Sequence, residues 1–208
     1  MKMQKILYKG GEGELIEKKS RFIATTRPVE TEEEALAFLA EMKKKYWDAT
    51  HNCSAFVIGD RQQIQRCSDD GEPQGTAGRP MLDVLLGEDI HNMAVVVTRY
   101  FGGTLLGTGG LVRAYTAAAR DALEHASIRE LCLCEMLEVS ADYAEYEKVR
   151  RYLAQKGLAP VQTDYTDKVF LRIPVRLGEL ENTEREITSL TAGKCRLSRA
   201  GREYYPAS

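Results

Sequence analysis

Residues 98–115 read TRYFGGTLLGTGGLVRAY, and five of the nine residues from Gly102 to Gly110 are glycine. The run MAVVVT at 93–98 is short and apolar, which predicts a buried strand. In residues 110–126, the positions of Leu111, Tyr115 and Ala118 predict an amphipathic helix. The segment is therefore expected to fold as a buried strand, a glycine-rich loop and a helix.

The glycine-rich loop is a candidate anion-binding site. A loop that leads into a helix N-terminus presents unpaired backbone N–H groups, which suit phosphate or carboxylate. Arg99 and Arg113 are placed to flank such a site. The predicted anion contacts from this segment are Arg99, Tyr100, Gly102, Gly103, Gly107, Gly109, Gly110 and Arg113. The alternative is that the glycines serve only tight packing between strand and helix.

The standard nucleotide-binding motifs do not fit this loop. Thr108 follows the second glycine of the spacing Gly102-x-x-x-x-Gly107, where a P-loop has lysine. Val112 stands where the dinucleotide fingerprint requires its third glycine. Any anion site here therefore has a different construction.

The segment SDDGEPQGTAGRP at 68–80 is dense in turn formers and predicts a loop. Its carboxylates suit either a hard cation or turn chemistry, and the Asp-Gly, Glu-Pro and Gln-Gly pairs favour the turn. We therefore expect no metal and no cofactor. The predicted loop contacts are Asp69, Asp70, Glu72 and Gln74, with Arg79 as the residue that meets an anion.

His51 and Cys53 lie two residues apart in the predicted strand 49–59, on one face. This pairing permits a cysteine nucleophile activated by histidine. However, the sequence names no third group that would orient the imidazole. We expect His51 to contribute to binding rather than to catalysis.

The remaining N-terminal elements are predicted as strands at 13–18, 21–26 and 62–67 and helices at 31–45 and 81–86. Thr31 and Glu34 form a capping box, and Ala35, Leu36, Leu39 and Met42 are expected to form the buried stripe of the first helix.

After residue 128 the pattern changes. Strands are predicted at 131–141, 159–165, 168–177 and 194–200, and helices at 143–155, which ends at Gly157, and 179–191. This β-α-β-β-α-β order is that of a ferredoxin-like domain. The chain is therefore expected to be an α+β protein with domains at 1–130 and 131–208.

Composition limits the class of protein. The formal net charge of −2 over 208 residues argues against a basic coat over the whole surface, while a local basic patch remains compatible. No apolar run is long enough to span a membrane, and the N-terminus lacks a secretory signal. The five cysteines include no C-x-x-C pair, which favours buried thiols in a cytoplasmic protein.

Several longer motifs resemble the YigZ/IMPACT family over about residues 15–125. They are Ser20-Arg-Phe22, Ala49-x-His-Asn-Cys-x-Ala55, the whole segment 68–80, Thr98-Arg-Tyr-Phe-Gly-Gly103 and Gly107-x-Gly-Gly-Leu-x-Arg-Ala-Tyr115. The resemblance implies an N-terminal two-layer α/β sandwich like the second domain of a ribosomal small-subunit protein, the GHMP kinases and domain IV of elongation factor G. It also implies a C-terminal domain like the ferredoxin-like domains of elongation factor G.

The resemblance and the local chemistry together favour a non-enzymatic, translation-linked regulator that binds RNA, the ribosome or a translation factor. Eukaryotic members of the family regulate translation through a protein partner. Here Arg21, Arg79, Arg99 and Arg113 would contact phosphates, and Tyr100 and Phe101 would stack on unpaired bases. The alternative is an enzyme or sensor that binds a small phosphorylated ligand in a groove like that of the GHMP kinases, although no general base and no lysine stand near the loop in the sequence.

Overall fold

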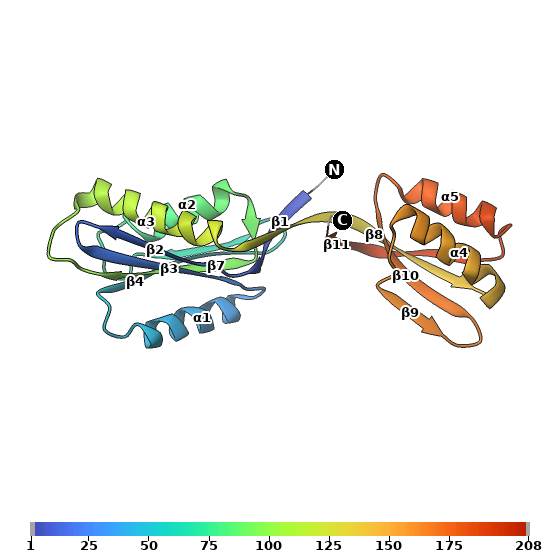
Figure 1. The fold of residues 1–208 in the computed structure, drawn as a ribbon, viewed down its shortest axis with the longest axis horizontal. Coiled ribbons are helices and arrows are strands. Elements are labelled where there is room, and N and C mark those ends of the chain that lie inside the picture. Colours follow the sequence, from blue (N-terminus) through green and yellow to red (C-terminus); the bar gives the residue numbers. More distant parts are fainter. Residues whose placement is uncertain (1–2, 207–208) are drawn as a thin grey trace. The chain divides into compact units, whose positions relative to one another are not determined.

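The computed structural model describes residues 3–206, which divide into two compact units at Glu130 and Leu131. The division lies within one long strand, β8 (Ser127–Ala141). Both units contain helices and a β-sheet, as expected for an α+β protein (Figure 1). No helix in this described range is long and apolar enough to cross a membrane.

The N-terminal unit, residues 4–130, is built on an antiparallel five-stranded sheet with the order β2-β3-β7-β4-β5. These strands are β2 (Glu12–Glu17), β3 (Ser20–Pro28), β4 (His51–Ile58), β5 (Ile64–Ser68) and β7 (Met93–Tyr100). The glycine-rich loop follows β7, which lies at the centre of this sheet.

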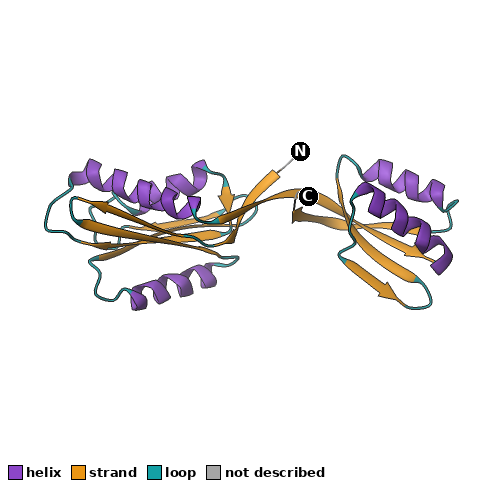
Figure 2. Ribbon diagram, in the orientation of Figure 1, coloured by secondary structure: helices purple, strands orange, loops and turns teal. Residues whose placement is uncertain are grey.

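Helices cover both faces of this sheet (Figure 2). Helices α2 (Gly78–Gly87) and α3 (Gly107–Glu124) pack on the face that carries Phe22, Cys53 and Val97. Helix α1 (Glu32–Lys45) packs on the opposite face, against Phe56 and Val96. Because neighbouring residues of a strand face opposite sides, one apolar strand serves both cores. The expected two-layer sandwich therefore has a third layer, formed by α1.

The start of α1 confirms Thr31 as the cap: the backbone N–H of Glu34 donates to the Thr31 hydroxyl at 3.2 Å. The other half of the predicted capping box is shifted by one residue, because the Glu34 carboxylate accepts from the backbone N–H of Glu30 at 2.8 Å. The predicted apolar stripe was partly wrong. Leu36 is 54% exposed, whereas Phe38 is buried with Ala35 and Met42. The buried positions follow the i, i+3, i+7 spacing, which turns Leu36 toward solvent.

Two short strands of the N-terminal unit carry no clear signal in the sequence. Strand β1 (Met3–Lys9) pairs in parallel with β6 (Ile90–His91), which is two residues long. Leu7 and Ile90 enter the same apolar core as α2 and α3. Because this pairing joins segments far apart in the chain, local periodicity could not reveal it.

The C-terminal unit, residues 131–206, has the predicted β-α-β-β-α-β order. After β8 come α4 (Tyr143–Lys156), β9 (Gln162–Tyr165), β10 (Val169–Arg176), α5 (Leu180–Leu190) and β11 (Arg196–Pro206). All neighbouring strands are antiparallel in the order β11-β8-β10-β9. This is the ferredoxin-like arrangement. Gly157 ends α4 with a φ of 68°, which confirms the predicted C-cap.

Candidate functional site

Asp69 organises the loop 68–80. Its carboxylate accepts hydrogen bonds from the backbone N–H groups of Gly75 at 2.8 Å, Ala77 at 3.0 Å and Gly78 at 2.8 Å. Burial raises the pKa of this carboxyl, but the three donors outweigh burial and leave the pKa below its ordinary value. Asp69 thus caps the start of α2, which begins at Gly78, three residues earlier than predicted.

Asp70 ties the same loop to β4. Its Oδ2 atom accepts the backbone N–H of Asn52 at 2.7 Å, and its backbone oxygen lies 2.9 Å from Nδ1 of His51. Lys43 donates to its Oδ1 atom at 2.6 Å. Both aspartates therefore hold the loop in place, and the turn interpretation accounts for their contacts.

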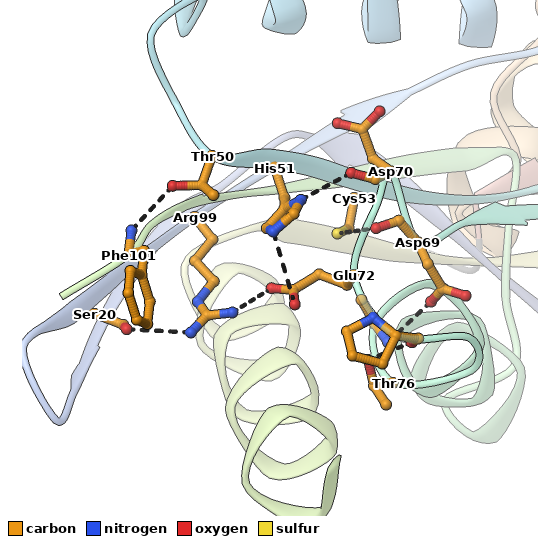
Figure 3. Close-up of polar contacts among 12 residues, drawn as sticks. Ser20, Thr50, His51, Cys53, Asp69, Asp70, Glu72, Thr76, Arg99 and Phe101 are labelled. Atoms are coloured by element: carbon orange, nitrogen blue, oxygen red, sulfur yellow. Dashed lines mark hydrogen bonds and ion pairs between the residues drawn. The ribbon is translucent and has the colours of Figure 1, made fainter. Parts of the chain in front are cut away.

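Glu72, the third carboxylate of the loop, points into the protein and pairs with Arg99. Its Oε1 atom accepts from Arg99 Nη1 at 2.5 Å (Figure 3). The same oxygen accepts from the Tyr115 hydroxyl at 2.8 Å. Only 6% of the Arg99 side chain and 3% of the Glu72 side chain are exposed. Charges removed from water to this extent are stable only when they are paired and hydrogen-bonded.

Arg99 is also enclosed by aromatic rings. Its guanidinium lies 5.3 Å from the ring centre of Phe22 and 5.5 Å from that of Phe101. Its Nη2 atom donates to the Ser20 hydroxyl at 3.3 Å, while Nε is buried and has no hydrogen-bond partner in the described part of the chain. Arg99 is thus fixed on several sides and does not reach into solvent.

His51 lies opposite Arg99 in the register of β4 and β7. Because the backbone oxygen of Asp70 can only accept, Nδ1 of His51 carries the proton that joins them. Its Nε2 atom lies 3.8 Å from Oε2 of Glu72, too far for a hydrogen bond. The imidazole is therefore oriented by its Nδ1 side and presents Nε2 toward the carboxylate (Figure 3).

Cys53 does not pair with His51. Its Sγ atom lies 3.3 Å from the Tyr115 hydroxyl and 3.0 Å from the backbone oxygen of Asp69. Burial raises the pKa of the Cys53 thiol to about 12 and also raises the pKa of Tyr115. A thiol that stays protonated is a poor nucleophile, so this geometry does not support a cysteine–histidine catalytic pair.

His51, Glu72 and Arg99 line a pocket of about 430 Å³, here called the Arg99 pocket. Its floor is His51, Glu72 and Arg99, and its apolar side is Phe101, Leu105, Leu106 and Leu111. Gly107 and Thr108 of the first turn of α3 also line it. Leu105 is 82% exposed and Phe101 is 46% exposed, so the rim of the pocket is open and apolar.

The first turn of α3 carries no side-chain cap; its N-cap position is Leu106. The helix begins at Gly107, three residues earlier than predicted, with a φ of 71° at that glycine. Gly109 and Gly110 lie in this first turn, and Gly103 lies in the loop before it, also with positive φ. The loop thus delivers an uncapped helix N-terminus to the pocket.

Gly102 has a packing role. A Cβ atom at this position would lie 2.0 Å from the backbone carbon of Lys19, in the turn between β2 and β3. Its backbone N–H donates to the Ser20 hydroxyl at 3.2 Å. For this glycine the packing alternative holds, since only a residue without a side chain permits so close an approach.

The other predicted arginines do not converge on the Arg99 pocket. Arg21 pairs with Glu14 at 2.8 Å and stands opposite Tyr100 across the strands, on the sheet face away from Arg99. Arg79 pairs with Asp83 at 2.8 Å on the exposed side of α2. The Tyr100 hydroxyl donates to Asp48, and Gln74 is exposed on the loop.

Arg113 lines a second, smaller groove of about 280 Å³ with Lys18, here called the Lys18 groove. Glu17 and Gly110 also line it, and Leu106 borders both this groove and the Arg99 pocket. Within residues 3–206, neither Lys18 nor Arg113 forms an ion pair. The two hollows therefore share Leu106 as a lining residue.

Sequence reasoning missed Lys18 and Lys19. They form the two-residue turn between the paired residues Glu17 and Ser20, with φ values of 46° and 67°. Left-handed backbone in two consecutive lysines is uncommon and marks a turn held by its surroundings. The turn lies beside Gly102, so the structure places two lysines next to a loop that has none near it in the sequence. The sequence did offer one indication of these lysines: they directly precede the motif Ser20-Arg-Phe22, which is part of the family resemblance.

Comparisons with known proteins agree for both units. The model of the Impact N-terminal domain matches residues 18–123, and that of a domain of unknown function, DUF1949, matches residues 139–194. The chain is 42% identical to IMPACT family member YvyE of Bacillus subtilis, over 88% of this chain and 85% of that protein. It is 34% identical to IMPACT family member YigZ of Escherichia coli, over 86% and 89%.

The match to Protein IMPACT of the mouse is partial: 38% identity over 45% of this chain and 30% of that protein. A crystal structure described as that of a hypothetical protein superposes with a TM-score of 0.62 at 32% identity, covering 98% of this chain and all of that one.

Proposed function

Because the chain belongs to the YigZ/IMPACT family, we propose that its N-terminal unit is a non-enzymatic RNA-binding module that acts in translation. The module binds a single-stranded segment of RNA. An unpaired base enters the Arg99 pocket, and neighbouring phosphates bind at the Lys18 groove.

The observation that carries this proposal is that the Arg99 pocket and the Lys18 groove are neighbours, with Leu106 lining both. The Arg99 pocket offers the exposed ring of Phe101 and the apolar side chain of Leu105 to a flat ring. The Lys18 groove offers the cations of Lys18 and Arg113 to the backbone. Proteins that bind single strands combine stacking surfaces with cationic tracks in this way.

The cationic character is local. Glu17 shares the Lys18 groove, and the chain as a whole carries a formal net charge of −2. Binding should therefore use few phosphate contacts and weaken with salt accordingly. Duplex RNA buries its bases, so it cannot fill the Arg99 pocket and should bind less tightly.

A fluorescence anisotropy titration of the full chain with a labelled single-stranded RNA tests the proposal. We expect binding at about 50 mM salt that weakens toward about 200 mM, and weaker binding of a duplex of the same length. The double variant Lys18→Ala, Arg113→Ala should lose affinity. The matched control is Lys44→Ala, Arg61→Ala, which removes two exposed cations elsewhere on the unit. Absence of binding at low salt would overturn the proposal.

The size of the Arg99 pocket favours a second candidate, a sensor of a small phosphorylated ligand. Its volume of about 430 Å³ lies within the range of small-molecule sites. Such a ligand would place its phosphate at the uncapped start of α3. Thermal shift with free nucleotides, with and without magnesium, separates the two functions. Stabilisation by one free nucleotide, with no RNA binding, would favour the sensor.

A further inference from the structure

The geometry of the Arg99 pocket points to guanine as the base that it selects. This inference rests on the proposed RNA-binding function and adds specificity to it. It follows from the hydrogen-bonding capacity that His51 and Glu72 leave unused.

His51 presents an acceptor to the pocket. Its Nδ1 atom carries a proton because it meets the backbone oxygen of Asp70 at 2.9 Å. In the neutral imidazole, Nε2 is then an acceptor with a free lone pair. His51 lines the pocket, and 19% of its side chain is exposed.

Glu72 presents a second acceptor. Its Oε1 atom receives Arg99 and Tyr115, whereas its Oε2 atom receives no hydrogen bond from residues 3–206. The Oε2 atom lies 3.8 Å from Nε2 of His51. The pocket floor thus holds two neighbouring acceptors that no donor of the described chain satisfies.

Neither acceptor is a fully buried unpaired atom, so water reaches both in the free protein. A base that displaces this water leaves both acceptors unpaired unless it brings two neighbouring donors of its own. Among the RNA bases, only guanine carries two adjacent donor groups, N1–H and the N2 amino group, on its Watson–Crick edge. Adenine and cytosine place a ring acceptor beside their amino group, and uracil places its single N–H between two carbonyl oxygens.

The walls fit a purine as well. Phe101 is an exposed aromatic ring at the rim, and Leu105 and Leu111 add apolar surface. These contacts hold any base by stacking and apolar burial, so they supply affinity without selection. Selection then depends on Glu72 and His51 alone, which makes it separable from RNA binding as such.

The test uses RNAs of the form UUUXUUU with the full chain, where X is guanine, inosine, adenine, cytosine or uracil. We expect guanine to bind roughly ten-fold or more tightly than adenine, the discrimination that a good bidentate contact provides. Inosine lacks the N2 amino group and should fall between them. The analogue 7-deazaguanine keeps both donors and should match guanine.

The variant His51→Ala removes one acceptor and should shrink the ratio of guanine to adenine affinity. His125→Ala, at an exposed histidine after α3, is the matched control and should keep the ratio. The comparison of UUUXUUU RNAs uses the unmodified protein, so it tests the inference even if a variant fails to fold. Equal affinity for all bases, or a preference for another base, would overturn the guanine inference and leave RNA binding intact. Absence of any binding would overturn the RNA proposal itself, and the guanine inference with it.

Discussion

The guanidinium of Arg99 and the carboxylate of Glu72 form a 2.5 Å ion pair in which both side chains are more than nine-tenths buried. The pair joins the central strand β7 to the loop 68–80 and holds the floor of the Arg99 pocket. The sequence predicted that Arg99 contacts an anion at an open site, but in the structure the Glu72 carboxylate already neutralises its charge. Its function is to fix Glu72 as well as to line the pocket.

Breaking this pair from one side should destabilise the N-terminal unit strongly. Arg99→Met leaves Glu72 charged and buried, which costs about 3–5 kcal/mol. Urea unfolding measures the change. Arg79→Met, which breaks the exposed pair with Asp83, is the control and should cost at most about 1 kcal/mol. Equal, small effects for both variants would contradict the role of burial.

Removing the exposed ring at the pocket rim should weaken RNA binding with little loss of stability. Phe101→Ala should lower the affinity by roughly 5- to 150-fold, the value of one base-stacking contact. Phe170→Ala is the control, because Phe170 has nearly the same exposure, 45% against 46%, but belongs to the C-terminal unit. A larger loss in Phe170→Ala would place the RNA site on the other unit.

The cations of the Lys18 groove should appear in the salt dependence. For single strands, each phosphate contact contributes about 0.7 to the slope of log affinity against log salt. Lys18→Ala and Arg113→Ala should therefore each make the slope shallower by about that amount. Titrations at several salt concentrations measure it. An unchanged slope in both variants would show that neither side chain meets a phosphate.

Asp69 should make stability depend on acid pH. Its folded pKa lies below the ordinary value of 3.8, so its stabilisation is present above that pH and is lost as pH falls through the folded pKa. Asp69→Ala should therefore cost about 0.5–2 kcal/mol near neutral pH, as loss of a helix cap does, and less in acid, where the Asp69 carboxyl of the native protein is protonated. Urea unfolding of the native protein and the variant, near neutral pH and in acid, measures this difference in the free energy of unfolding. A constant difference would contradict the capping role.

The buried thiol should resist alkylation. Because burial raises the pKa of Cys53 to about 12, the thiolate is scarce near neutral pH, and the side chain is inaccessible as well. Cys67 is exposed and should react first with iodoacetamide in the native protein. Peptide mass spectrometry identifies the labelled site. Rapid labelling of Cys53 in the folded chain would show that the apolar core around it opens.

Much of the fold could be predicted because its signals are local. The ferredoxin-like order of the C-terminal unit followed from short periodic runs and from Gly157, whose φ of 68° suits a helix end. The strand β7 followed from one apolar run. The starts of α2 and α3 were placed three residues late, because Asp69 caps α2 from nine residues away and Gly107 begins α3 with no cap in the sequence.

The sequence by itself determined the classes of element, and it predicted two domains and a binding site at the glycine-rich loop. Tertiary structure alone decided which charges meet. Arg21, Arg79, Arg99 and Arg113 look alike in the sequence, but strand alternation and helix packing send them to different surfaces. Burial then selects the partners: Arg99 pairs with Glu72 because an unpaired charge is too costly inside. Lys18 and Arg113 form no ion pair within residues 3–206 and lie at the surface, where water solvates them.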